Sequence, residues 1–272
     1  MVASSRTVGR VAWRDGVPGD GHRAVAEETA IAFSYDGSTY AVMMATPADL
    51  EDFAVGLTLT EGIVSAPREI EALEIVEHAI GIDLSMRLAA PRKDALAARR
   101  RYLTGPVGCG LCGIESLDEA MRSVPKVVAN ARVSPRDIEA AIAAVSAGQT
   151  LNRETRAVHA AGLWRAGHAA IVREDVGRHN ALDKLAGALA RQDIAAADGI
   201  VVLTSRLSVE LVQKAAMIGA PLLVAVSAPT ALAIRTAETA GITLAAIARD
   251  DGFEVFTHPE RIALATETVH VG

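Results

Sequence analysis

Aromatic side chains are scarce in this chain: they make up 3% of its 272 residues, although 50% of the residues are hydrophobic. The core must therefore consist mostly of Ala, Val, Leu and Ile, whose small side chains suit close packing of helices against a sheet. Intrinsically disordered chains have fewer apolar residues, so this composition excludes a disordered chain. The length corresponds to one or two globular domains.

An excess of positive charge and an uninterrupted apolar helix are also missing. The net charge is −6, from 27 basic and 33 acidic residues, which argues against a protein that binds duplex nucleic acid. Residues 215–234 form a run of twenty residues without a charge, long enough to span a bilayer. Pro221 and Pro229 interrupt this run, so we interpret it as a helix end, a buried strand and a new helix start. We expect no membrane segment and no nucleic-acid partner.

Cysteine is nearly absent: the sequence contains two cysteines, Cys109 and Cys112. Two cysteines are too few for the disulfide scaffold of a secreted protein, and the first ten residues lack the apolar core of a secretory signal. We therefore expect a cytoplasmic protein, in which a close cysteine pair more often serves redox or transfer chemistry. A structural zinc site would need two further ligands in a spaced cluster, so we expect no bound metal.

The first 130 residues are expected to form two parts. Residues 1–25 are rich in Gly, Arg and Asp and are interpreted as a flexible arm, whereas residues 26–130 are interpreted as a smaller α+β region that carries the cysteines. Turn residues, a helix cap and alternating apolar residues are the signals in this region. They predict a hairpin over residues 30–43 with its turn at Asp36-Gly37, a helix over residues 50–60 capped by Asp49, and a strand over residues 80–88.

Residues 131–272 are expected to form an α/β core domain. Ser134, followed by Pro135, predicts the start of its first helix. Three strand–helix units come next, and this alternation predicts a mostly parallel sheet covered by helices. The expected strands lie at residues 169–173, 200–203 and 222–226, their helices are expected to begin at the caps Asn180, Ser208 and Thr230, and a hairpin over residues 242–257 closes the domain.

The two cysteines lie in a glycine-rich segment, G-C-G-L-C-G at residues 108–113. A thioredoxin-like pair would instead follow a strand and open a firm helix. A thiol on a glycine-rich loop can accept a group at one site and deliver it at another, as a carrier of persulfide sulfur must. The basic run at residues 99–101 would favour the thiolate if the fold brings it near. The alternative is a pair of ordinary thiols without a role.

Polar residues also gather where the expected strands end, and open α/β sheets bind their ligands at such ends. Residues 173–184 hold eight polar or charged residues in twelve. Helix capping does not explain Asp175, Arg178 and His179, so we expect at least one of them to belong to a site.

Two further loops, at residues 204–208 and 227–230, place hydroxyl groups at expected helix N-termini. Backbone N–H groups at such positions favour phosphate. Together with the charged residues at 249–251 these loops predict a crevice for an anionic ligand, although the P-loop and G-x-G-x-x-G motifs are both absent.

These features together resemble the FdhD family, whose members are sulfur carriers required for active formate dehydrogenases. The matching segments extend over most of the chain, at residues 60–64, 108–113, 173–184, 212–217, 227–231 and 257–259. The resemblance implies a fold like that of the cytidine deaminases, with a three-layer, mostly parallel sheet and a smaller N-terminal α+β region. It also implies a homodimer.

The resemblance further implies a sulfurtransferase activity. Sulfur from a cysteine desulfurase would be carried as a persulfide and passed to the molybdenum or tungsten bis-guanine-dinucleotide cofactor of formate dehydrogenase. By position, Cys109 matches the persulfide-bearing cysteine and Cys112 its partner. The residues expected to bind the guanine-dinucleotide cofactor are Ile247, Ala248, Arg249, Asp250, Asp251, Gly252, Ser227, Thr230 and His179.

Two other functions stay open at this point. One is a cofactor-binding chaperone of formate dehydrogenase with dispensable cysteines, and the other is a dithiol oxidoreductase that turns over a disulfide without a stable persulfide. A zinc deaminase would need a P-C-x-x-C element. Gly108 precedes Cys109 here, so we exclude hydrolytic deamination.

Overall fold

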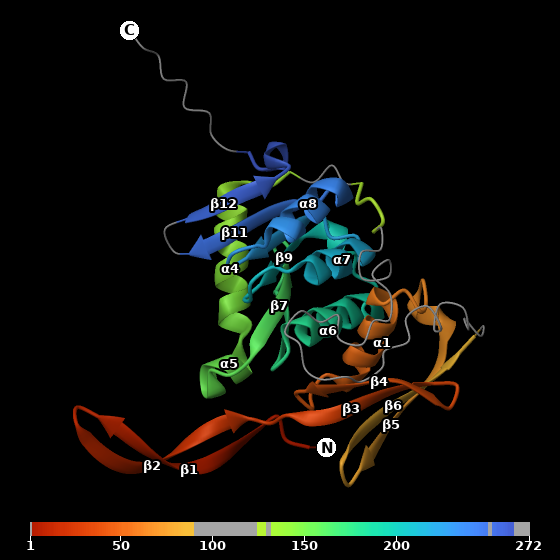
Figure 1. Ribbon diagram of the computed structural model, residues 1–272. Helices are drawn as coiled ribbons and strands as arrows, with labels where there is room; N and C mark the ends of the chain where they lie inside the picture. The colour runs from red at the N-terminus through yellow and green to blue at the C-terminus, as the bar shows by residue number, and fades with distance from the viewer. Residues whose placement is uncertain (1, 90–123, 129–131, 250–251, 264–272) are drawn as a thin grey trace.

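The computed structural model describes residues 2–89, 124–128, 132–249 and 252–263. Within these ranges the chain forms a two-stranded ribbon, a four-stranded sheet and a six-stranded sheet, with helices packed on the two larger sheets (Figure 1). No helix in these ranges is long and apolar enough to cross a membrane.

The N-terminal segment is a β-ribbon, so the expectation of a loose arm is wrong. Strands β1 (Ser5–Arg14) and β2 (Val17–Ala26) pair antiparallel along their whole length. Asp15 and Gly16 make the turn with φ of 51° and 82°, which is the left-handed geometry of a type I′ hairpin. The Asp-Gly pair is a strong hairpin signal that the polar composition of the segment obscured.

The following region is α+β, as its hairpin and helix signals predict. Its sheet has the order β4-β3-β6-β5, and β3 and β6 are parallel. Phe53 from the helix meets Phe33 from the sheet edge-on, with ring centroids 4.9 Å apart. The elements are β3 (Thr29–Tyr35), β4 (Ser38–Ala45), α1 (Leu50–Thr60), a 3-10 turn (Pro67–Glu69), β5 (Ile70–His78) and β6 (Gly81–Leu88).

Asp49 precedes α1 but does not cap it. Its backbone is left-handed, with φ of 54°, and its side chain makes no capping hydrogen bond. The carboxylate instead lies 3.5 Å from the Arg173 guanidinium. The Asp49 carboxylate, which the local sequence predicts to cap α1, therefore pairs with a cation that is distant in the sequence.

The core domain contains a six-stranded sheet and five helices in the described part of residues 131–272. Ser134 and Asp137 form a capping box at the start of the first helix, as the sequence predicts. The elements are α4 (Pro135–Gly148), α5 (Thr150–Thr155), β7 (His159–Trp164), β8 (Ile171–Asp175), α6 (Arg178–Arg191), β9 (Ile200–Leu203), α7 (Val209–Met217), β10 (Leu222–Ala225), α8 (Ala231–Ala240), β11 (Thr243–Arg249) and β12 (Gly252–Thr257), with 3-10 turns at Ala196–Asp198 and Pro259–Arg261.

The sheet is mixed rather than mostly parallel. Its order is β12-β11-β10-β9-β7-β8, and only the β9–β10 and β10–β11 pairs are parallel. Strand β7 lies antiparallel between β8 and β9, and β12 is an antiparallel edge. The β11–β12 pair confirms the hairpin predicted over residues 242–257, whereas strand–helix alternation does not predict the antiparallel β7. Strands β8, β9, β10 and β11 nevertheless point the same way.

Helices cover both faces of this sheet. Helix α4 packs on one face, where its buried Ile138 and Val145 share a hydrophobic cluster with β9 and β10 residues such as Val202 and Val224. Helices α6, α7 and α8 pack on the other face (Figure 1). The three-layer part of the predicted fold is therefore present, and the deaminase-like assignment stays a prediction.

Helix α1 joins the two larger sheets by packing directly on α6. The helices meet at Gly56 and Gly187, where a Cβ on either residue would overlap backbone atoms of the opposite helix. Such a close approach requires glycine on both sides. It fixes the α+β region against the helix that begins at the strand ends of the core domain.

Candidate functional site

The ends of the same-direction strands meet at one edge of the six-stranded sheet. Backbone bonds connect the loops that follow them: Val226 N–H donates to Leu203 O at 3.0 Å, and Ile247 N–H donates to Ser227 O at 3.3 Å. A further bond from Thr230 N–H to Leu207 O, 2.9 Å long, links the loops after β9 and β10. The predicted crevice edge is therefore one connected set of loops.

Ser227 and Thr230 lie on this edge and are both exposed. The Thr230 hydroxyl caps α8 by accepting from Ala233 N–H at 3.2 Å, as the sequence predicts. The other N–H groups of this first turn carry the positive end of the helix dipole. This end of α8 can therefore interact favourably with a negatively charged ligand.

The expected binding stretch at residues 247–252 begins on the same edge. Ile247 has a left-handed backbone with φ of 53°, within an irregularity in the β11–β12 pairing. This kink is followed by a buried Ala248 and an exposed Arg249. Gly252 pairs with Arg249 across the strands and has φ of 137°. Asp250 and Asp251 lie outside the described residues, as do Cys109 and Cys112.

His179 enters the site from the first turn of α6. Its Nε2 lies 3.1 Å from Glu210 Oε2 and 3.5 Å from Ser208 Oγ. Glu210 is nearly buried, with 5% of its side chain exposed. Sequence reasoning missed Glu210 as a partner of His179; its place in the first turn of α7, where a carboxylate is favoured, was the available signal.

Ser208 occupies the N-cap position of α7, but its side chain makes no capping bond. The hydroxyl instead lies beside His179. The predicted helix start is therefore confirmed and the predicted role of the side chain is wrong.

His159 is a further imidazole on this edge, at the start of β7. Burial lowers its pKa, the positive charge of Arg178 acts in the same direction, and Asp175 opposes them. Neutral imidazole is thus favoured at His159. The edge combines one such imidazole with the guanidinium groups of Arg178 and Arg249.

Asp175 is a structural residue. It is completely buried, and Lys184 Nζ lies 2.7 Å from Oδ2. Three donors complete the shell of its carboxylate: Thr46 N–H, Gly177 N–H and Asn180 Nδ2 at 3.0, 2.7 and 3.0 Å. These bonds tie the core domain to the end of β4.

The sequence predicts Asn180 as the N-cap of α6, and this prediction is wrong. The helix begins at Arg178 after Gly177, so Asn180 lies inside the first turn. Its amide donates to Met44 O at 3.0 Å as well as to Asp175. A residue type that favours caps serves here to join two regions.

A second buried polar cluster lies further along α6. Lys214 Nζ donates to both oxygens of Asp183 at 2.9 and 3.1 Å and to Glu61 Oε1 at 3.0 Å. The Thr60 hydroxyl contacts Asp183 Oδ1 at 2.5 Å and Lys214 at 3.1 Å. Three separate motif segments, at residues 60–64, 173–184 and 212–217, therefore meet in one buried cluster.

The remaining charges of the 173–184 segment also have structural partners. Arg173 binds the Asp52 carboxylate at 2.7 Å, together with Arg191 from beyond the segment at 2.6 Å. Glu174 accepts bonds from the first N–H groups of α5, those of Leu151 and Asn152, both at 2.8 Å. In this segment Arg178 and His179 lie in the first turn of α6, at the edge where the crevice is predicted.

One H-x-E triplet is present, at His258-Pro259-Glu260, but its geometry is not that of a zinc deaminase. His258 Nε2 lies 3.1 Å from the carbonyl oxygen of Glu238, in a turn after β12. The described residues contain no group of three His, Cys, Asp or Glu side chains arranged to hold a metal ion.

Comparisons with known proteins agree with the motifs. Residues 26–263 match the FdhD/NarQ family. The chain is 58% identical to a protein of Agrobacterium fabrum over 96% of this chain and 97% of that one, and 55% identical to a protein of Brucella abortus over 95% and 97%. Both relatives are named sulfur carrier protein FdhD.

A solved structure is also similar. It is a crystal structure of a candidate formate dehydrogenase accessory protein from Desulfotalea psychrophila, 27% identical, with a TM-score of 0.77. The match covers 96% of this chain and 100% of that chain. Sequence, motifs and fold lead to the same conclusion: this chain belongs to the FdhD/NarQ family.

Proposed function

We propose that this protein is a sulfur carrier that moves persulfide sulfur from a cysteine desulfurase to the molybdenum or tungsten bis-guanine-dinucleotide cofactor of formate dehydrogenase. The observation that carries this proposal is the near full-length similarity to relatives named sulfur carrier protein FdhD. The pair Cys109 and Cys112 in its glycine-rich segment supplies the chemistry that such a name requires.

Loading is a thiol exchange. The Cys109 thiolate attacks the outer sulfur of the persulfide on the desulfurase, the sulfur–sulfur bond breaks, and the thiolate of the desulfurase leaves. A new persulfide now stands on Cys109. The exchange is redox-neutral, because one sulfur–sulfur bond replaces another.

Delivery needs two electrons, because the outer persulfide sulfur must leave as sulfide. The Cys112 thiolate can supply them by attacking the inner sulfur of the Cys109 persulfide. A Cys109–Cys112 disulfide forms, and hydrosulfide leaves toward the metal of the cofactor substrate. A cellular dithiol then reduces the disulfide before the next cycle.

The loops at the strand ends suit the nucleotide parts of this substrate. The N-terminus of α8 and the guanidinium groups of Arg178 and Arg249 provide positive potential in a chain whose net charge is −6. Ser227 adds an exposed hydroxyl, and His179 lies 3.1 Å from Glu210 in the first turn of α6. We propose that one guanine nucleotide half binds here with its phosphates on α8.

The test is an intact-mass measurement after incubation with a cysteine desulfurase and cysteine. Wild-type protein should gain one sulfur atom that reductant removes, Cys109→Ala should gain none, and Cys112→Ala should load but fail to release hydrosulfide. Titration with GDP serves as the folding control, since Cys109→Ala should bind GDP like the wild type.

The chaperone alternative gives the opposite result. A Cys109→Ala/Cys112→Ala double variant would then still yield active formate dehydrogenase in cells. A dithiol oxidoreductase would show disulfide turnover with a reductase and no mass gain. Either outcome overturns the carrier role.

A further inference from the structure

Two cationic residue types occupy the first turn of α6, where the helix disfavours positive charge. Arg178 and His179 are the first two residues of this helix, its first turn holds no acidic residue, and Gly177 at the N-cap position offers no side chain to cap it. Positive charge at the positive end of a helix dipole is unfavourable. Local preference therefore does not explain these two residues, and a conflict of this kind is typical of functional positions.

A buried carboxylate from the neighbouring helix faces His179. Helix α7 packs beside α6 (Figure 1), and Glu210 in its first turn places Oε2 3.1 Å from His179 Nε2. The side chains of His179 and Glu210 are 15% and 5% exposed. A carboxylate buried to this degree is costly unless positive charge offsets it. The N-terminus of α7 supplies part of that offset, and an imidazolium at His179 supplies more.

The contact with Glu210 favours the imidazolium form of His179. An opposite charge in direct contact favours the charged form of a titratable group by roughly 1–3 pH units. The partial burial of the ring and the positive charge of Arg178 act in the other direction. Coulomb energy falls with distance, so the carboxylate at 3.1 Å has the larger effect.

The other charged or titratable groups around this edge have smaller effects on His179. Each of them is neutral, paired or exposed to solvent. Burial favours neutral imidazole at His159, the Asp175 carboxylate is paired with Lys184 at 2.7 Å, and Arg206 is exposed. Glu210 is therefore the group that sets the charge of His179.

The imidazole lies against the loops that we assign to the nucleotide phosphates. Its Nε2 is 3.5 Å from Ser208 Oγ, at the end of the loop that follows β9. The preceding residue of that loop, Leu207, accepts from Thr230 N–H at 2.9 Å, and Thr230 caps α8. A positive charge on His179 therefore acts on an anion bound at this edge.

We propose that Glu210 is a positioning residue of the nucleotide site: it keeps His179 as the imidazolium that attracts the phosphates of a guanine nucleotide, and it thereby makes nucleotide affinity depend on pH. This inference rests on the proposed nucleotide site at the strand ends. It does not depend on sulfur transfer, because loading of Cys109 requires neither His179 nor Glu210. The intact-mass experiment and the experiment below can therefore fail separately.

The test is a calorimetric titration of wild type and Glu210→Gln with GDP at about pH 7.5 and about pH 5.5. At the higher pH an imidazole with its ordinary pKa of about 6.5 is mostly neutral, so Glu210→Gln should bind GDP about 5- to 10-fold more weakly. At the lower pH His179 is protonated in both proteins and the variant lacks the negative charge, so it should bind GDP at least as tightly as the wild type. Comparing the two proteins at one pH cancels the titration of GDP itself.

This change of sign with pH distinguishes positioning from other roles of Glu210. A residue that only supports the fold would weaken binding equally at both pH values when it is replaced. A carboxylate that only repels the phosphates would strengthen binding at both when it is removed. Either result overturns the proposal, and so does a wild type that does not bind GDP, which leaves the carrier role to the mass measurement.

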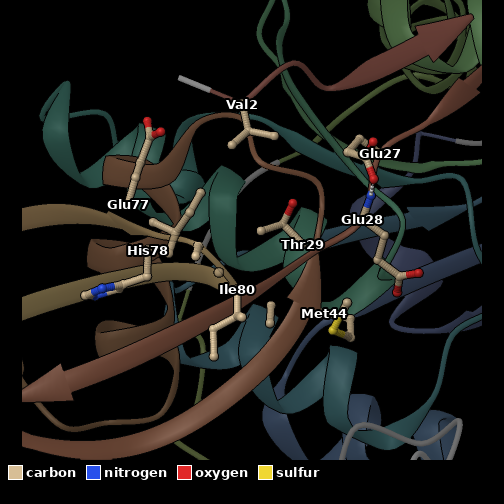
Figure 2. A pocket seen from close by; sticks show the side chains of 12 residues that line it. Val2, Glu27, Glu28, Thr29, Met44, Glu77, His78 and Ile80 are labelled. Atoms are coloured by element: carbon tan, nitrogen blue, oxygen red, sulfur yellow. Dashed lines mark hydrogen bonds between the residues drawn. The ribbon is translucent and has the colours of Figure 1, made fainter.

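Two further variants show whether Glu210 acts through His179. In a His179→Gln background, Glu210→Gln should cause no further loss of GDP affinity at about pH 7.5, whereas an equal loss in both backgrounds overturns the proposal. The matched control is Glu77→Gln, which removes the same charge from the pocket between the β1–β2 ribbon and the β5–β6 turn (Figure 2). It should bind GDP like the wild type. Circular dichroism checks that all variants are folded.

Nuclear magnetic resonance of the His179 ring gives a readout that does not require GDP. The chain has seven histidines, and the ring signals that disappear in His179→Gln identify those of His179. Their nitrogen shifts should titrate with a midpoint above the ordinary value of about 6.5 in the wild type. In Glu210→Gln the midpoint should fall by about one pH unit or more. Equal midpoints in the two proteins overturn the proposal.

Discussion

Replacing Lys214 by Met tests whether the cluster that joins the motif segments is an electrostatic unit. The ammonium group is nearly buried, with 3% of its side chain exposed, and it contacts Asp183 and Glu61. Methionine has a similar length and no charge, so the variant leaves two buried carboxylates without their cation. Breaking a buried ion pair from one side costs about 3–5 kcal/mol.

This magnitude is large against the total stability of a domain, about 5–15 kcal/mol. With an m-value of about 3 kcal/mol/M, the urea midpoint should fall by about 1–1.7 M. The matched control is Lys214→Met/Asp183→Asn, which removes one of the stranded charges. Its midpoint should lie above that of the single variant, because the pair of changes is coupled.

The pH dependence gives the sharper test. Burial raises the pKa of Asp183 above its ordinary value of 3.8, and Lys214 opposes that rise. A raised pKa means that the folded state binds the proton more tightly than the unfolded state, so this group contributes stability below pH 3.8 that is lost as pH rises through the folded pKa.

Without Lys214 the opposing effect is gone and the pKa of Asp183 rises further. As the pH falls, protonation of the Asp183 carboxyl group then reduces the loss of stability in the variant. The stability deficit should therefore be smaller at pH 5 than at pH 8. An equal deficit at both pH values, or a total loss below about 1 kcal/mol, would refute the reasoning.

Two other variants test the packing and the helix start. Gly187→Ala places a Cβ on the Asp52 carbonyl of α1, so we expect a loss of about 3 kcal/mol or more, although alanine favours helix by about 1 kcal/mol. Gly9→Ala, which meets nothing within 4 Å, is its control and should leave the urea midpoint unchanged. Ser134→Ala removes the cap of α4 and should cost about 1 kcal/mol, with Ser134→Asp restoring it; no loss would contradict the capping role.

Local signals in the sequence predict the elements whose determinants are local. The alternation at residues 80–88 becomes β6, and the pair Asp36-Gly37 turns the β3–β4 hairpin with φ of 48° and 83°. Ser134 and Thr230 cap their helices as expected. In each case the partner atom lies within a few residues, so the pattern and the structure depend on the same short stretch.

The errors arise where the partner is distant. Asn180 and Ser208 have the residue types of caps, but their side chains contact Met44 O and His179 instead, 136 and 29 residues away. Asp49 faces Arg173, more than a hundred residues away. Sheet order is non-local for the same reason, because nothing near residues 159–164 indicates that this strand lies antiparallel between two others.

Helix α6 shows how one polar segment can serve the fold and the candidate site at once. Asn180, Asp183 and Lys184 follow helical spacing and reach the α+β region through buried or partly buried hydrogen bonds. Arg178 and His179 occupy the first turn, at the open end of the strands. Because the same rigid helix carries both sets, the contact with α1 also sets where His179 stands. The α+β region therefore helps to position the first turn of α6 at the strand-end edge, although none of the candidate binding residues belongs to that region.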